Sequence, residues 1–189
     1  LYLSSNQFSG NISALQSLIS LQELTLSDNY FEIPSSLAPL FNLPNLKRIY
    51  AGNNTVYAEA KMPSLPPKFQ LEEISLSCCG VGGSFPQFLY HQNDLLYVDL
   101  SNTHFKGEFP IWLLENNTKL GTLYLANNSL FGNLQLPSLP HMDLSYFDIS
   151  INYFYGNIPI EIGAKLPSLR FLNMSIEKSF SWQHSGFNR

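Results

Sequence analysis

The stretch LSYFDISINYFYGNIP, residues 144–159, decides how this chain folds. It fits the pattern L-x-x-L-x-L-x-x-N-x-L-x-G-x-I-P when Phe or Ile is allowed in place of Leu. The matching residues are Leu144, Phe147, Ile149, Asn152, Phe154, Gly156, Ile158 and Pro159. Related stretches recur along the chain, and recurrence at a fixed period indicates an architecture of stacked repeats.

One small or polar residue recurs in the middle of every copy, at intervals of 23 to 25 residues. We call these the ladder residues; they are Asn6, Asn29, Asn54, Cys79, Thr103, Asn128 and Asn152. An asparagine amide carries donors and an acceptor, so it can tie the buried backbone of one turn to the next. Cysteine and threonine are small enough to take its place with weaker hydrogen bonds. The period is that of leucine-rich repeats.

The L-x-L core of each copy alternates like a short strand, which sends its apolar residues inward and the residue between them outward. We therefore predict an α/β solenoid, a right-handed leucine-rich-repeat superhelix with a parallel concave sheet and an irregular or 3-10 helical convex side. Residues 1–175 are expected to form about eight repeats without caps. Between Asn54 and Leu71, several prolines predict an extended excursion on the convex side.

The chain begins at Leu1, within a repeat, and residues 176–189 no longer fit the pattern. Both features predict a fragment, or a truncated product, of a longer protein. Glu177 stands where the eighth ladder residue belongs, and burial of its charge would be costly. The codons for Trp182 and Gln183 contain GGC one base out of frame, and the shifted frame can read A-F-H-G-N-I-P-A-S. The tail is thus a frameshifted repeat or, alternatively, a divergent terminal segment, and the transcript sequence distinguishes the two.

Composition and spacing exclude several classes of function. A net charge of -4 offers no basic surface for nucleic acid. Asp99 and Asp148 lie two repeats apart on an open face, which is a poor setting for a glycosidase carboxylate pair. The histidines lack metal-ligand spacing and are expected in exposed turns; they are His91, His104, His141 and His184. We predict no catalytic residues, no metal site and no cofactor.

Three segments are similar to one plant family beyond the generic repeat. They are LSCCGVGGSFPQFLYHQNDLLYVDLS, FPIWLLENNTKLGTLYLANNSLFG and IPIEIGAKLPSLRFLNMS. The irregular GNNTVYAEAKMPSLPPKFQLEEISLS strengthens the likeness because it is not repeat consensus. Over most of residues 20–175, the chain resembles the ectodomains of plant leucine-rich-repeat receptor-like proteins, which are cell-surface receptors without a kinase. The resemblance implies a type I membrane glycoprotein, although this chain lacks the cysteine-pair caps and the transmembrane helix.

From this resemblance we expect extracellular recognition of a peptide or protein ligand in defence or developmental signalling. A co-receptor kinase is a further expected partner, and the chain would lie on the extracellular side of the plasma membrane as part of a longer protein. Two alternatives stay open. One is a secreted inhibitor of a wall-degrading hydrolase built on the same repeat. The other is a non-functional truncated product, secreted or mislocalised.

The outward residues of the predicted strands form two rows on the concave face. One row runs Tyr2, Thr25, Tyr50, Ser75, Asp99, Tyr124, Asp148, Asn173, and the other runs Glu23, Arg48, Glu73, Tyr97, Thr122, Tyr146, Phe171. Tyrosine offers a rigid apolar body with a polar tip and is common in recognition, although strands favour it anyway. The predicted ligand-binding cluster is the densest one, Tyr97, Asp99, Tyr124, Tyr146 and Asp148. It would suit a peptide or a basic ligand.

Asn-x-Ser/Thr sequons predict N-glycosylation at Asn11, Asn53, Asn116, Asn127 and Asn173. Asn116 is the strongest candidate because it falls in a convex turn, whereas Asn53 and Asn127 adjoin ladder residues near the concave rim.

The only two cysteines, Cys78 and Cys79, are adjacent, so they predict neither an ordinary long-loop disulfide nor a metal site. Cys79 is expected to be buried as a ladder residue and Cys78 to point outward.

Overall fold

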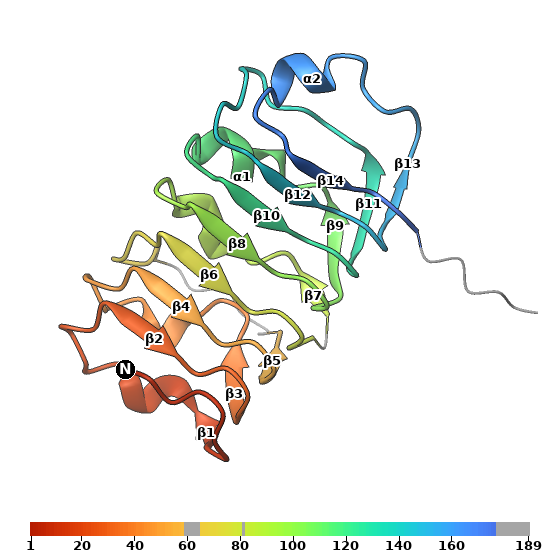
Figure 1. The fold of residues 1–189 in the computed structure, drawn as a ribbon. Coiled ribbons are helices and arrows are strands. Elements are labelled where there is room, and N and C mark those ends of the chain that lie inside the picture. The colour runs from red at the N-terminus through yellow and green to blue at the C-terminus, as the bar shows by residue number, and fades with distance from the viewer. Residues whose placement is uncertain (59–64, 81, 177–189) are drawn as a thin grey trace, which may run out of the picture.

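The computed structural model describes residues 1–58, 65–80 and 82–176, which wind as a solenoid of stacked turns (Figure 1). Each turn adds one short strand to a parallel sheet of order β14-β12-β10-β8-β6-β4-β2. The strands are β2 (Glu23–Thr25), β4 (Arg48–Tyr50), β6 (Glu73–Ser75), β8 (Tyr97–Asp99), β10 (Thr122–Tyr124), β12 (Tyr146–Asp148) and β14 (Phe171–Asn173). This sheet carries the concave face, and the predicted solenoid with its parallel concave sheet is confirmed.

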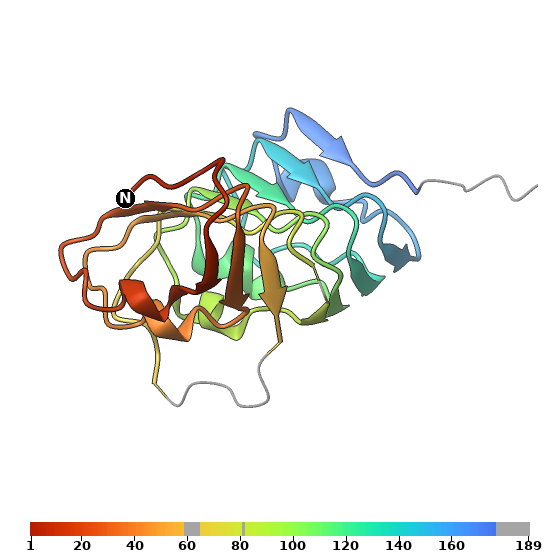
Figure 2. The same ribbon diagram turned by 90° about the horizontal axis from the view of Figure 1, so that it is seen from below.

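The segments that follow the ladder residues form two more parallel sheets, which the sequence pattern did not predict. The first has the order β1-β3-β5 and the second the order β13-β11-β9-β7. Their strands are β1 (Ser9–Asn11), β3 (Tyr30–Pro34), β5 (Thr55–Tyr57), β7 (Gly83–Ser84), β9 (Phe105–Glu108), β11 (Ser129–Asn133) and β13 (Tyr153–Tyr155). We call them the lateral sheets, because they run along one flank of the solenoid beside the concave sheet (Figure 2).

Short helices lie on the convex side. They are the 3-10 helices η1 (Ile12–Leu15), η2 (Ala38–Leu40) and η3 (Gln87–His91) and the α-helices α1 (Ile111–Asn116) and α2 (Ile162–Lys165). Pro86 and Pro110 stand directly before η3 and α1. A proline suits a helix start, because the amide proton it lacks would have no partner within the helix. Within the described ranges, no helix combines the length and apolarity that a membrane crossing needs.

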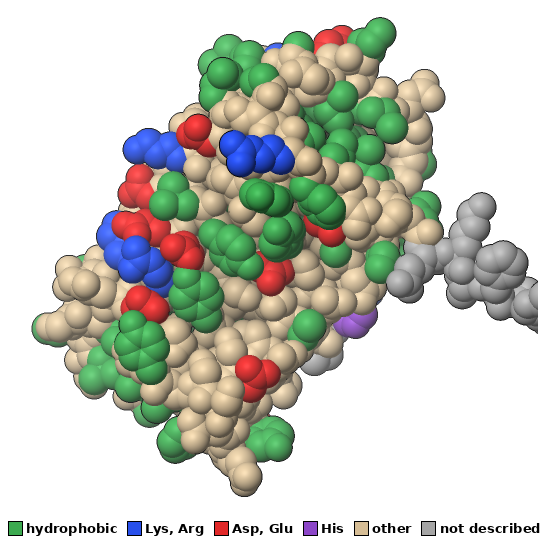
Figure 3. Space-filling model, viewed as in Figure 1, with side chains coloured by type: hydrophobic (Ala, Val, Ile, Leu, Met, Phe, Trp, Pro, Cys, Tyr) green, Lys and Arg blue, Asp and Glu red, His purple; other side chains and the backbone are tan. Residues whose placement is uncertain are grey.

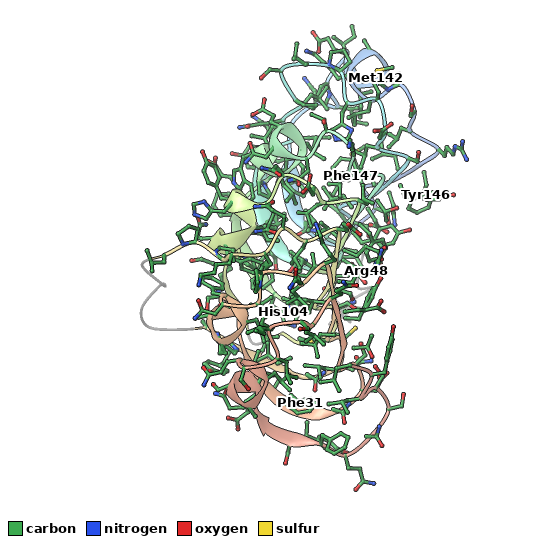
Figure 4. All side chains as sticks on the ribbon, turned by 90° about the vertical axis from the view of Figure 1, so that its left-hand side faces the viewer. Phe31, Arg48, His104, Met142, Tyr146 and Phe147 are labelled. Atoms are coloured by element: carbon green, nitrogen blue, oxygen red, sulfur yellow. The ribbon has the colours of Figure 1, made fainter. Side chains whose placement is uncertain are left out.

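The core is one continuous column between the concave sheet and the convex helices. The middle residue of each concave strand faces this column; from β2 to β12 these are Leu24, Ile49, Ile74, Val98, Leu123 and Phe147. Figure 4 shows the alternation in β12, where Phe147 lies within the interior and its neighbour Tyr146 lies at the outer edge. Phenylalanine rings fill the convex half of the column, with Phe69 edge-on to both Phe41 and Phe88.

Some predictions fall outside the described residues. These are the tail from Glu177 onward, including His184, and residues 59–64 of the predicted excursion. The repeat boundary at 175 and the tail remain predictions.

Candidate ligand-binding site

Strand pairing sets the outward side chains of the concave sheet into two rows. Each strand supplies its first and third residues, because its middle residue faces the core. The first row is Glu23, Arg48, Glu73, Tyr97, Thr122, Tyr146 and Phe171, and the second is Thr25, Tyr50, Ser75, Asp99, Tyr124, Asp148 and Asn173. Tyr2 extends the second row through its bridge to Thr25. The register brings the five predicted ligand-binding residues together on three adjacent strands.

The charged half of this face lies over β2, β4 and β6 and is centred on Arg48. Its guanidinium contacts Glu72 at 3.0 Å and Glu73 at 3.3 Å, and it is 3.8 Å from Glu23. Lys47 adds a contact of 3.8 Å to Glu72. The hydrogen bond to Glu73, followed by the nearby carboxylates, raises the pKa of Arg48. The two cations are therefore fully paired within the protein itself, against three carboxylates.

The aromatic half lies over β8, β10, β12 and β14, where exposed apolar and acidic side chains gather (Figure 3). The rings of Tyr97 and Tyr124 pack edge to face, with centroids 6.1 Å apart. Tyr146 and Phe171 pair across β12 and β14, and each is 43% exposed. Burial raises the pKa of Tyr97 to about 12, with further contributions from the negative charge of Asp99 and from Tyr124. This half presents aromatic surface beside carboxylates.

The two aspartates of this half also shape the backbone, a role that sequence reasoning missed. Asp99 Oδ1 accepts a hydrogen bond from the Ser101 amide at 3.0 Å. Asp148 Oδ1 accepts from both the amide and the hydroxyl of Ser150, at 2.9 and 2.6 Å, and its Oδ2 accepts from Asn173 Nδ2 at 3.1 Å. Asp148 is thus fully engaged, whereas Asp99 keeps one oxygen without a donor among the described residues.

Phe171 and Asn173 extend the aromatic half by one strand beyond the predicted cluster. Phe171 continues the row of Tyr97 and Tyr146, and Asn173 binds Asp148 directly. Both residues stand in the two rows predicted from the sequence, but the predicted ligand-binding cluster included only tyrosines and aspartates.

The ladder residues form a chain of buried hydrogen bonds beneath the rim of the concave sheet. Asn128 Nδ2 donates to the carbonyls of Leu100 and Leu125 at 2.8 and 3.0 Å, and its Oδ1 accepts from the Phe105 amide at 2.8 Å. Asn29, Asn54 and Asn152 repeat this arrangement.

The remaining ladder positions depart from that arrangement. Cys79 and Thr103 are buried, and their side chains also bond to backbone carbonyls, Ala51 and Leu100 respectively. Asn6 reaches the carbonyls of Leu3 and Ser4 but is exposed.

A second polar ladder, missed from the sequence, lies at the other edge of the concave sheet. Gln92 and Asn117 are buried, and their side-chain oxygens accept from the amides of Leu71 and Leu95 at 2.7 and 2.9 Å. His141 follows at the next interval, with Nε2 3.0 Å from the Asn117 carbonyl. The spacing of 25 and 24 residues was a usable signal, but these positions lie outside the recurring L-x-x-L-x-L-x-x-N pattern.

The prediction that the histidines lie in exposed turns is wrong for His141. Its side chain is buried, and both ring nitrogens have partners there. Nε2 bonds to the Asn117 carbonyl, and Nδ1 accepts a hydrogen bond from the Leu144 amide at 3.2 Å. His91 and His104 are exposed. Across the described residues, no group of three or more His, Cys, Asp or Glu side chains is placed to hold a metal ion.

The five sequon asparagines differ in their surroundings. Asn11 and Asn53 are exposed, whereas the other three are partly buried. Asn116 Nδ2 donates to the Tyr90 carbonyl at 3.1 Å on the convex side. Asn127 donates to Asn102 Oδ1 at 2.7 Å near the rim. Asn173 is the only sequon asparagine of the described chain within the two rows, so a glycan there would border the aromatic half.

Comparison with known proteins places this geometry in a family. The family model for the leucine-rich repeat matches residues 20–40. Cuscuta receptor 1 of Solanum lycopersicum is 36% identical over 92% of this chain, and Receptor-like protein 1 of Arabidopsis thaliana is 40% identical over 92%. The chain belongs to the plant leucine-rich-repeat receptor-like proteins. It spans 16% of the length of each of these two relatives.

Solved structures extend the comparison of this receptor-like protein chain. The ectodomain of the Arabidopsis receptor kinase HAESA, in complex with an N-terminal extended IDA peptide hormone ligand, is 30% identical with a TM-score of 0.73. The alignment covers 94% of this chain and 30% of that one. The PEPR1–AtPEP1 complex is 25% identical with a TM-score of 0.62, and the alignment covers 92% of this chain and 31% of that one.

Proposed function

We propose that this chain is a ligand-recognition segment of a receptor-like protein and that it binds a peptide across the aromatic half of its concave face. The observation that carries the proposal is the contrast between the two halves of that face. Arg48 pairs with its glutamates, whereas Tyr146 is exposed and the half-buried rings of Tyr97 and Tyr124 pack, among the described aromatic rings, only against each other. Rigid aromatic side chains of this kind dominate the energetics of many recognition surfaces.

The relatives support this proposal. HAESA and PEPR1 have the same fold over this length; HAESA was solved in complex with a peptide hormone ligand and PEPR1 in complex with AtPEP1. By analogy, we propose that the chain acts on the extracellular side of the plasma membrane, in defence or developmental signalling, with a co-receptor kinase as a second partner. Glycosylation of the sequon asparagines belongs to the same proposal. No feature of the concave face favours inhibition of a wall-degrading hydrolase.

The test uses the 189-residue chain displayed on yeast cells and a library of random 12-residue peptides as the probe. Tyr124→Ala should weaken the selected peptides about 30-fold, the loss expected when a central aromatic contact is removed. Tyr153→Ala is the matched control, because Tyr153 is an exposed tyrosine on a lateral sheet. It should leave the affinity unchanged.

Peptides that bind equally well to the wild-type chain and to Tyr124→Ala would refute concave-face recognition. Inhibition of a wall-degrading hydrolase by the displayed chain, in the absence of peptide binding, would favour the alternative role. Protease sensitivity of the displayed chain, measured in parallel, separates loss of binding from loss of folding.

A further inference from the structure

The carboxylates of the concave face differ in how far the protein satisfies them. Every ion pair within the described residues belongs to the group around Lys47 and Arg48. Both oxygens of Asp148 accept hydrogen bonds, three in all. Asp99 receives only the Ser101 amide on Oδ1, so Oδ2 has no donor in the described part of the chain. Asp99 is therefore the open carboxylate of the aromatic half.

Asp99 has aromatic side chains on one side and a short side chain, Ser75, on the other. In the second row it lies between Ser75 on β6 and Tyr124 on β10. Tyr97, two residues earlier on the same strand, points to the same face and packs edge to face against Tyr124. Ser75 is short, and its hydroxyl lies 3.2 Å from the hydroxyl of Ser77. A side chain that enters from β6 would thus meet Asp99 and the two tyrosines together.

The negative charge of Asp99 and the adjacent tyrosine rings both favour a positively charged side chain at this place. A cation gains a charge-assisted hydrogen bond from a carboxylate and a further attraction from an aromatic face. An acidic group would face Asp99 with no cation in either row of the aromatic half to compensate. Arg170 adjoins the first row, directly before Phe171 and in the same column as Lys47, but it lies three strands away from Asp99.

Resting on the proposed function, we propose that the peptide ligand presents an arginine or lysine side chain to Asp99, beside the paired rings of Tyr97 and Tyr124. Asp148 instead stabilises the backbone turn at Ser150 and binds Asn173 on β14. The site therefore selects peptides by one cationic residue, with the remaining contacts made to Tyr146 and Phe171.

The experiment repeats the selection with the displayed chain and reads the sequences of the enriched 12-residue peptides. Arginine or lysine should be enriched at one position. For one such peptide, Asp99→Ser should weaken binding about 10- to 100-fold, the range expected for loss of a charge-assisted contact. Serine is chosen because Ser75 occupies the same row, and because asparagine at this place would create an Asn-x-Ser sequon with Ser101.

One matched variant and one modified peptide complete the test. Asp28→Asn, at an exposed rim carboxylate outside the two rows, should have no effect. Replacement of the cationic residue by citrulline, a neutral isostere of arginine, should cost the wild-type chain as much as Asp99→Ser does. Combined with Asp99→Ser, the citrulline peptide should show no additional loss.

The outcomes separate this inference from the function on which it rests. Peptides that need Tyr124 but show no cationic preference, or that are insensitive to Asp99→Ser, would overturn the inference and leave concave-face recognition standing. Peptides insensitive to Tyr124→Ala would overturn both.

Discussion

At the scale of single residues, the ladder asparagines bond to backbone groups where the chain leaves the concave sheet and strand-to-strand backbone pairing is interrupted. Each of the four buried ones serves the carbonyls of two successive turns and accepts one further backbone amide. Asn128 does so for Leu100, Leu125 and Phe105. Buried peptide groups are costly to leave without partners, so the fold depends strongly on these side chains.

Asn128→Ala is expected to lower the free energy of unfolding by about 3 kcal/mol, because several buried backbone groups lose their partner at once. Asn93→Ala, at an exposed asparagine, is the control and should change it by less than about 0.5 kcal/mol. Urea unfolding followed by circular dichroism measures both. Equal stability of the two variants would show that the ladder is dispensable.

The residue before each ladder position adopts a left-handed backbone. This set comprises Ser5, Asp28, Asn53, Cys78, Asn102, Asn127 and Ile151. Asparagine and aspartate tolerate the left-handed region, whereas a β-branched side chain is strained there. Ile151, with φ of 53°, is the strained member of the set.

Ile151→Asn should therefore raise the free energy of unfolding by about 1 kcal/mol. Ile151→Val keeps the branched side chain and should give no gain. Thermal unfolding midpoints of the two variants decide the matter. A destabilised Ile151→Asn chain would mean that the isoleucine side chain contributes more through packing than the backbone loses.

The adjacent cysteines should react very differently. Cys78 is exposed, whereas burial raises the pKa of Cys79 to about 11. At pH 8, a maleimide should label Cys78 alone in the folded chain and both thiols in urea. Because the folded pKa is raised, the stability contributed by the neutral Cys79 thiol is complete below about pH 9 and is lost as the pH rises toward 11. Preferential labelling of Cys79, read by peptide mass spectrometry, would contradict the register.

At the scale of elements, the two lateral sheets separate between β5 and β7. This break coincides with the two ladder positions that are not asparagine, Cys79 and Thr103. Elsewhere the ladder oxygen accepts the amide of the preceding lateral strand, but the Val56 amide donates to the Cys79 backbone carbonyl instead. Gly80 then passes so close to Thr103 that an added Cβ would lie 2.5–2.6 Å from its backbone atoms.

Gly80→Ala should consequently lower the free energy of unfolding by more than about 2 kcal/mol, because neither backbone can shift without disturbing the ladder. Gly163→Ala, in α2 with open space around the added Cβ, should be neutral or slightly stabilising. The comparison needs only their urea midpoints. Similar midpoints would mean that the contact at Gly80 is relieved at little cost.

The sequence alone predicted the two rows of the concave face, because strict alternation and a fixed repeat length leave one register for each strand. It did not predict the lateral sheets, whose short strands lie outside the L-x-L alternation. Burial of His141 and the different engagement of Asp99 and Asp148 were equally hidden. Each depends on an atom one turn away, the Asn117 carbonyl or the Asn173 amide, and no local pattern reports such a neighbour.

At the scale of the whole molecule, the solenoid separates its tasks between faces. The core column and the two polar ladders hold successive turns in register, and the convex helices close the core from behind. The concave sheet is then free to vary its outward residues without affecting the stack. This separation explains how one face can combine a self-matched charged half with an aromatic half that stays open to a ligand.

The most direct test of this account is to cover the aromatic half with a glycan. Ser75→Asn creates an Asn-x-Ser sequon with Ser77 beside Asp99, and Asn173 already occupies the same row without disturbing the sheet. Gln135→Ser is the control, because it creates a sequon at Asn133 on a lateral strand. With occupancy verified by mass spectrometry, the first glycan should abolish binding of the selected peptides, and the second should leave it intact. Peptide binding that survives the glycan at position 75 would contradict recognition on the concave face.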